Sequence, residues 1–264
     1  MFSFTIDQLY GWMAAFLWPF FRLLGLFASA PLFGESTIPK RVKIALAAAL
    51  TVAVAPALGP MPDIPPASYA GLGIAVQQTL IGIMLGLTMR VVFAAVQTAG
   101  EYIGLQMGLS FASFFDPSTG GNTAVLSRML NLIAMLLFLA LDGHLLMLQG
   151  LLHSFETLPI SDAPLHVAGW GLLNQWGGQV IISGLLMALP LMTALMTINL
   201  CMAILNRTAP QMSVFAVGFP ISLIAGMIML TVMIPQTSGF LERLIAAGLE
   251  TMEGVAAGFA VQGP

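Results

Sequence analysis

The chain is poor in charge. Asp, Glu, Lys and Arg together make up 7% of its 264 residues, whereas a soluble domain carries about 25%. The eight basic residues form no extended patch, so the composition argues against a nucleic-acid-binding protein. Residues 163–206 and 208–241 contain no charged residue at all. Uncharged apolar runs longer than about 18 residues are typical of membrane helices, and we therefore expect an integral membrane protein.

Cysteine, lysine and histidine are also scarce, which removes most enzyme signatures. The single cysteine, Cys201, cannot form an intrachain disulfide, and its apolar surroundings predict a packing role. Neither of the two lysines follows a glycine, so no Walker A loop is possible. The three histidines form no HExxH zinc site, and no Gly-x-Ser-x-Gly elbow occurs. The sequence predicts no enzyme, no metal site and no cofactor.

Apolar segments dominate what remains. The segment pattern predicts an all-α membrane protein, organised as one domain over residues 1–264. We expect a polar connection over 153–178, and an amphipathic helix over 240–264 that lies on a membrane or a partner. The predicted apolar segments are residues 9–33, 42–58, 70–99, 126–152, 179–204 and 214–234.

Basic residues give an orientation. Lys40, Arg41 and Lys43 form the densest basic cluster, between the first two apolar segments. Loops rich in Lys and Arg stay in the cytoplasm, so we predict that this cluster is cytoplasmic. Arg22 lies well inside the first segment, where an unpaired charge would cost about 3 kcal/mol. The sequence leaves open whether Arg22 pairs, snorkels or lies outside the hydrocarbon.

Small residues recur at helical spacing. Such faces let helices approach closely and predict dense helix packing, within the chain or with partners. The repeats are Gly82 and Gly86; Gly100, Gly104 and Gly108; and Gly218, Ser222 and Gly226.

Residues 104–122, GLQMGLSFASFFDPSTGGN, form an unusually apolar loop without Lys or Arg. Its glycines and the Asp116-Pro117 pair make a continuous helix past about residue 108 unfavourable. An irregular backbone cannot face lipid, because its polar groups would lack partners. The loop is therefore a candidate gate, or alternatively a packing loop with no gating role.

One further place could carry chemistry. Asp142 and His144, in LALDGHLL, could relay protons in a proton-coupled small-solute transporter. Alternatively, Gly143 breaks the helix near an interface, where both side chains meet water. Arg207, Pro210 and Gln211 predict a tight polar turn between two apolar segments.

Three motifs stand out along the chain: IPKRVKIALA (residues 38–47), AGEYIGLQMGLSFASFFDP (99–117) and NRTAPQMSVFAVGFP (206–220). Together they resemble the FliR family of flagellar export proteins and its type III secretion counterparts. The resemblance runs from about residue 5 to about residue 245. The third motif holds the family-signature turn, with Arg207, Pro210, Gln211, Gly218 and Pro220.

The resemblance implies a non-enzymatic component of the flagellar export gate in the bacterial inner membrane, within the basal body. A FliR-like chain joins FliP and FliQ as a single copy, with FlhB and FlhA nearby, in a spiral of long kinked helical hairpins partly raised toward the periplasm. Unfolded flagellar subunits are the expected substrates, and membrane lipid the surrounding medium.

The resemblance also implies a channel plug over residues 106–122. Glycines 104, 120 and 121 are expected to supply its hinges. The plug residues carried over are Gln106, Met107, Gly108, Phe111, Phe114 and Phe115.

Overall fold

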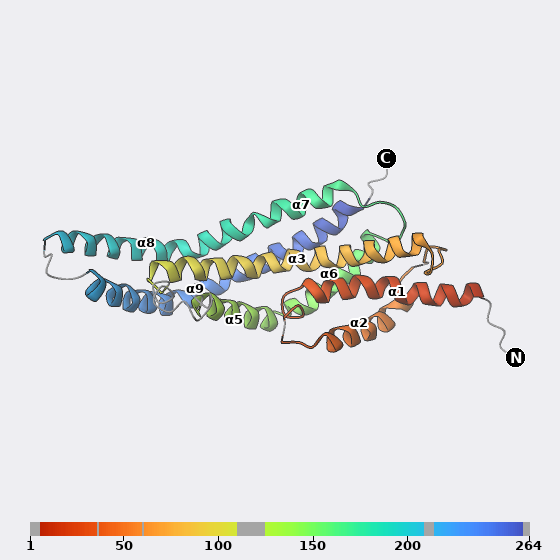
Figure 1. The fold of residues 1–264 in the computed structure, drawn as a ribbon, viewed down its shortest axis with the longest axis horizontal. Coiled ribbons are helices and arrows are strands. Elements are labelled where there is room, and N and C mark those ends of the chain that lie inside the picture. Colours follow the sequence, from red (N-terminus) through yellow and green to blue (C-terminus); the bar gives the residue numbers. More distant parts are fainter. Residues whose placement is uncertain (1–5, 36, 60, 110–124, 209–213, 261–264) are drawn as a thin grey trace. The chain divides into compact units, whose positions relative to one another are not determined.

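The protein is all-α in the part of the chain that the structure describes. The computed structural model describes residues 6–35, 37–59, 61–109, 125–208 and 214–260, and no strand occurs among them (Figure 1). The helices are α1 (Ile6–Ser29), α2 (Lys40–Val54), the 3-10 helix η1 (Ala55–Ala57), α3 (Tyr69–Gln106), α5 (Val125–Ala140), α6 (Gly143–Thr157), α7 (Val167–Gly177), α8 (Gln179–Thr208) and α9 (Val214–Phe259).

Four helical stretches in the described residues are long and apolar enough to cross a membrane, and a fifth is possible as a bent pair. The stretches are Gln8–Ser29, Tyr69–Gln106, Val167–Thr208 and Gly218–Phe259. This confirms an all-α membrane protein. The second predicted segment, 42–58, is not among the candidate spans, because α2 has only 15 residues and ends in η1.

Two other expected segments differ in detail. The fourth segment, 126–152, is split into α5 and α6 by a break at residues 141–142. The expected polar connection, 153–178, is largely helical: α6 continues to Thr157, and α7 begins at Val167. Trp176 in α7 donates an indole hydrogen bond to the Thr88 carbonyl of α3 at 2.8 Å.

The chain divides into two compact units. The first comprises Met1–Val91, Asp142–Gly177 and Ala247–Pro264, and the second comprises Val92–Leu141 and Gly178–Ala246. Both units draw on segments far apart in the sequence. That they act as one domain stays a prediction.

In the first unit, α1 and α3 pack backbone to backbone. A Cβ built on Gly25 would lie 3.0 Å from the Ile83 nitrogen, and one built on Gly82 would lie 2.9 Å from the Leu26 nitrogen. Ser29 adds a hydrogen bond from its hydroxyl to the Ile83 carbonyl, at 3.0 Å. The Gly82 and Gly86 repeat thus permits close helix approach, as predicted.

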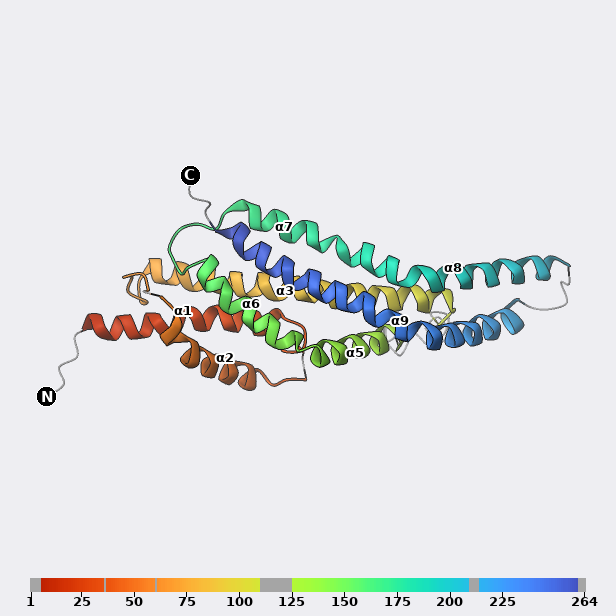
Figure 2. The same ribbon diagram turned by 180° about the vertical axis from the view of Figure 1, so that it is seen from behind.

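The end of α9 also belongs to the first unit. Phe259 is 1% exposed, and its ring meets the Trp170 ring of α7 edge-on, with 5.5 Å between centroids. The two helices run side by side there (Figure 2). Residues 240–259 do form a helix with one apolar face, but they continue α9 rather than standing apart. Where this face was expected on a membrane or a partner, Met252, Val255 and Phe259 are buried within the chain itself.

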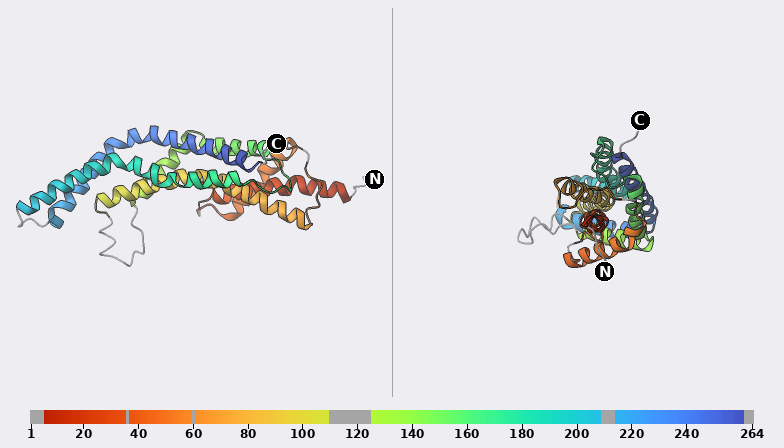
Figure 3. Two further views of the ribbon diagram at one scale, coloured as in Figure 1. Left: turned by 90° about the horizontal axis from the view of Figure 1, so that it is seen from above. Right: turned by 90° about the vertical axis from the view of Figure 1, so that its right-hand side faces the viewer.

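The second unit packs the later part of α3 against α5 and α8. Phe93 and Phe138 meet edge-on, with 5.5 Å between ring centroids. The Ser127 hydroxyl donates to the Gln97 carbonyl at 2.8 Å. Gly184 of α8 faces α3, where an added Cβ would lie 2.9 Å from the Ala95 oxygen. Figure 3 shows the early part of α9 alongside α8 as a helical hairpin.

Large apolar side chains also point outward from this hairpin. Leu200 and Val232 are 62% and 64% exposed. Cys201 is exposed as well, so the packing role expected from its apolar neighbours was wrong within the chain itself. Exposed apolar faces of this kind are typical of surfaces that contact lipid or partner helices.

Candidate functional site

The carboxyl end of α3 is the one part of the expected plug that the structure describes. Leu109 N donates to the Gly104 carbonyl and Gly108 N to the Leu105 carbonyl, both at 3.0 Å. Gly108 has a φ of 78°, a conformation that glycine adopts without steric cost. These features make a Schellman motif, which ends a helix and satisfies its last carbonyls. The predicted end of continuous helix near residue 108 is confirmed.

The predicted plug residues fall on both sides of this helix end. Gln106 is the last residue of α3, and Met107 is fully buried. Gly104, expected as a hinge, lies inside α3, with its carbonyl engaged by Leu109. The plug and hinge residues Phe111, Phe114, Phe115, Gly120 and Gly121 lie outside the described residues.

The family-signature turn is described at its two ends. Arg207 is exposed in the last turn of α8, where a cation complements the helix dipole. Gly218 is buried in α9, and Pro220 lies within the same helix. Pro210 and Gln211 lie outside the described residues, so the tight turn stays a prediction.

The basic cluster opens α2. Lys40 and Arg41 are exposed in its first turn, and Lys43 donates to the Glu35 carbonyl at 3.0 Å. Positive charge is unfavourable at the amino end of a helix, so these residues do not stabilise α2 itself. Their cytoplasmic placement stays a prediction.

Arg22 makes four hydrogen bonds and one contact with an aromatic ring in the first unit. Its guanidinium donates to Gln78 Oε1 at 2.7 Å, to the Ser154 carbonyl at 2.9 Å and hydroxyl at 3.1 Å, and to the Leu158 carbonyl at 2.9 Å. The ring of Phe155 stacks on it. All these partners are uncharged, and Arg22 is 0% exposed. The sequence alone did not link Arg22 to these partners, because Gln78 and Ser154 are only two of several polar residues in α3 and α6.

This cluster closes the carboxyl end of α6. Leu158 follows the last residue of α6, and its carbonyl has no further turn of helix to satisfy it; Arg22 donates to this carbonyl. The Ser154 carbonyl accepts both from Leu158 N, at 3.0 Å, and from Arg22. A positive charge there also complements the helix dipole. Of the three possibilities left open for Arg22, the structure selects burial with hydrogen-bond partners, although no partner is acidic.

Asp142 and His144 lie at the break before α6. Asp142 is exposed, with a φ of 54°, and its carbonyl accepts from Leu145 and Leu146. His144 is partly buried, and its Nδ1 has no hydrogen-bond partner among the described residues. The structure gives no hydrogen bond between the two side chains within that part of the chain. The exposed carboxylate fits a helix break that meets water better than a buried proton relay.

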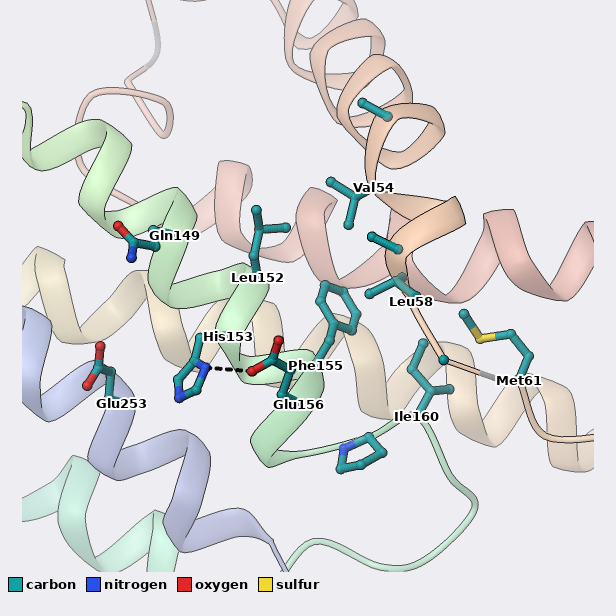
Figure 4. A pocket seen from close by; sticks show the side chains of 14 residues that line it. Val54, Leu58, Met61, Gln149, Leu152, His153, Phe155, Glu156, Ile160 and Glu253 are labelled. Carbon is teal, nitrogen blue, oxygen red and sulfur yellow. Dashed lines mark hydrogen bonds and ion pairs between the residues drawn. The ribbon is translucent and has the colours of Figure 1, made fainter.

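A groove of about 950 Å³ lies in the first unit, between α6 and the α2–η1 segment (Figure 4). Its walls are largely apolar, with Leu58 and Ile160 facing Leu152 and Phe155. His153 and Glu156 pair at 3.0 Å on its rim. No group of three or more His, Cys, Asp or Glu side chains in the described ranges could hold a metal ion.

Comparisons with known proteins all indicate one family. The family described as "Bacterial export proteins, family 1" matches residues 13–248. The flagellar biosynthetic protein FliR of Escherichia coli (strain K12) is 46% identical over 93% of this chain and 94% of its own length. FliR of Pectobacterium carotovorum subsp. carotovorum is 48% identical over the same shares. FliR of Bacillus subtilis (strain 168) is 30% identical over 92% of this chain and 95% of its own length.

Proposed function

Since this chain belongs to the FliR family of bacterial export proteins, we propose that it is a component of the flagellar type III protein export gate. With FliP and FliQ it forms the channel that passes unfolded flagellar subunits. The observation that carries this proposal is the identity of 46–48% to flagellar FliR proteins over 93% of the chain. The relatives are named as biosynthetic proteins, not as enzymes.

The proposed setting is the bacterial inner membrane at the flagellar basal body. A single copy of the chain completes a spiral with FliP and FliQ, next to FlhB and FlhA, and part of the assembly is raised toward the periplasm. The four or five span-capable stretches support a membrane setting. The outward apolar faces of α8 and α9 offer surfaces for neighbouring helices or lipid.

Residues 106–122 are proposed as the channel plug, with Phe111, Phe114 and Phe115 as its apolar stopper. Supporting this is the Schellman end of α3, which stops the helix just before the aromatic residues. An aromatic side chain contributes about 1.5–3 kcal/mol when buried. Three of them can hold a closed state that an arriving substrate displaces.

Co-expression with FliP and FliQ tests the proposed function. A single complex of defined size should purify with this chain, and a cell lacking its own FliR should regain export of flagellar subunits when it expresses the chain. The matched control expresses the chain without FliP and FliQ, and should give unstable protein. A chain that is monodisperse alone, never joins FliP and FliQ, and restores no export would contradict the proposal.

A further inference from the structure

The side chain of Met107, one residue beyond α3, fits into a notch in α9. Met107 is 0% exposed. The notch exists because residue 226 has no side chain: a Cβ added to Gly226 would lie 2.6 Å from Met107 Cγ and 2.8 Å from its sulfur. Real Cβ atoms do not approach other atoms so closely, so any larger residue at 226 would displace Met107.

A polar contact lies beside the notch. Asn199 of α8 accepts a hydrogen bond from the Ser222 hydroxyl of α9 at 2.6 Å. Its amide nitrogen in turn donates to the Gln106 carbonyl at 3.5 Å. Asn199 therefore links α8 to α9 through Ser222, and it also contacts the carbonyl of Gln106, the last residue of α3.

The helix end itself is closed by hydrogen bonds. Because the Gly104 carbonyl accepts from Leu109, bending at Gly104 would break the Schellman motif. Gly108 holds the left-handed conformation and is the first residue past the buried Met107. The hydrogen-bonded end of α3 therefore extends through Leu109, and both Gly104 and Gly108 belong to it.

We infer that the α8–α9 hairpin is a fixed anchor for the carboxyl end of α3, with Met107, Gly226 and Asn199 as its positioning residues. The inference rests on the proposed function, since it concerns where the chain enters the proposed plug. The anchor stays engaged while substrate passes. Gly104 is then part of the anchor and not a hinge.

A reversible cross-link tests the anchor directly. In a Cys201→Ser background, the pair Met107→Cys and Gly226→Cys should form a disulfide. An added Cβ at 226 would lie 2.6 Å from Met107 Cγ, the atom bonded to Met107 Cβ, which brings the two Cβ atoms close to the spacing of about 3.5–4.5 Å that a disulfide requires. In cells carrying the complete gate, export of flagellar subunits should be the same with the disulfide closed or reduced. Loss of export that a reductant restores would overturn the inference. A pair that fails to cross-link in the assembled gate would overturn it as well.

A double-mutant cycle gives a second readout. Gly226→Ala should expel Met107 and make the membrane permeable to a small dye, and adding Met107→Ala should restore tightness by making room for the new methyl group. Neighbouring residues that act through one contact are expected to be non-additive in this way. Additive effects of the two changes would overturn the proposed contact between Met107 and the notch at Gly226.

Conservative polar variants separate positioning from folding. Asn199→Asp keeps the acceptor for Ser222 but loses the donor to Gln106, and should raise dye uptake without lowering the yield of the gate. Thr231→Ala is the matched control, because it removes an exposed hydroxyl of α9 that donates to the Met227 carbonyl of the same helix, and it should leave the dye barrier in place. Equal dye uptake in the two variants would contradict the proposed role of Asn199.

The two proposals fail in different ways. If replacing Phe111, Phe114 and Phe115 with serine leaves the gate tight, the proposed plug fails, while the cross-link still decides the anchor. If the plug test succeeds and the cross-link blocks export, only the anchor fails.

Discussion

The guanidinium of Arg22 in α1 lies over the ring of Phe155 in α6, with 4.1 Å between its Cζ atom and the ring centroid. The same guanidinium donates hydrogen bonds to the carbonyls of Ser154 and Leu158 and to the side-chain oxygen of Gln78 in α3. One buried charge thus joins three helices of the first unit. Because its partners are neutral, the arrangement depends on the number of hydrogen bonds and on the stacking, not on an ion pair.

Replacing Arg22 should destabilise the first unit. Arg22→Met leaves the Leu158 carbonyl and the Gln78 side-chain oxygen without this donor, and each buried group left unsatisfied costs about 1–3 kcal/mol. Arg22→Lys keeps the charge but lacks the planar fork and the stacking, so we expect an intermediate loss. The melting temperature of the purified gate measures this. Arg243→Met changes an exposed arginine in α9 and is the matched control; an equal effect at both positions would contradict the role assigned to Arg22.

The close approach of α1 and α3 predicts opposite outcomes for two glycines of α3. Gly82→Ala would press a methyl group against the α1 backbone, which cannot yield as a side chain can, and should lower the stability and yield of the protein. Gly73→Ala meets nothing within 4 Å and should be neutral or stabilise by about 0.5–1 kcal/mol, because alanine favours the helix. Thermal melting of both variants distinguishes packing from helix propensity. Equal melting temperatures for the two variants would mean that Gly82 does not pack against the α1 backbone.

The buried end of α9 predicts that its last aromatic residue supports the fold. Phe259→Ala should destabilise by about 3–5 kcal/mol, the usual cost of removing a buried aromatic side chain. Phe219→Ala removes the same group from a position on α9 that is 37% exposed and should cost much less. Limited proteolysis and melting of the two variants provide the comparison. A tail that lies on a membrane or a partner instead would leave the isolated chain insensitive to Phe259→Ala.

The proposed plug predicts a leak. Replacing Phe111, Phe114 and Phe115 together with serine should leave assembly with FliP and FliQ intact but admit ions and small dyes. Replacing the same three residues with leucine keeps large apolar side chains in the loop, so this variant should be less permeable than the serine variant. Conductance or dye uptake in cells with the complete gate measures the difference. An assembled serine variant as tight as the parent would mean that the loop only packs.

The basic cluster predicts the side of the membrane. A cysteine at Thr37, next to Lys40 and Arg41, should react only with reagents that enter the cytoplasm. One at Ala67, in the loop before α3, should react with an impermeant reagent from outside. Both positions are exposed in the chain, and the tests belong in a Cys201→Ser background. Equal labelling from outside at both sites would reject the orientation.

The sequence by itself determined the membrane class, the family and one helix end. Two long charge-free runs cannot be reconciled with a soluble core, and Gly108 marks where helix formation becomes unfavourable whatever surrounds it. These conclusions depend on composition and local conformation. Similarly, the signature motifs identify the family because they can be read along the chain.

Only the tertiary structure decided what covers each apolar or polar face. Arg22 finds its partners 56 to 136 positions away, so no local pattern could have indicated which of the three possibilities holds. The apolar stripe of residues 240–259 reads the same whether lipid, a partner or α7 covers it, and the fold places it inside the chain. Periodicity shows that a face must be buried, whereas the covering surface is set by contacts between distant segments. For the same reason the notch at Gly226 became visible only when α9 was seen against the end of α3.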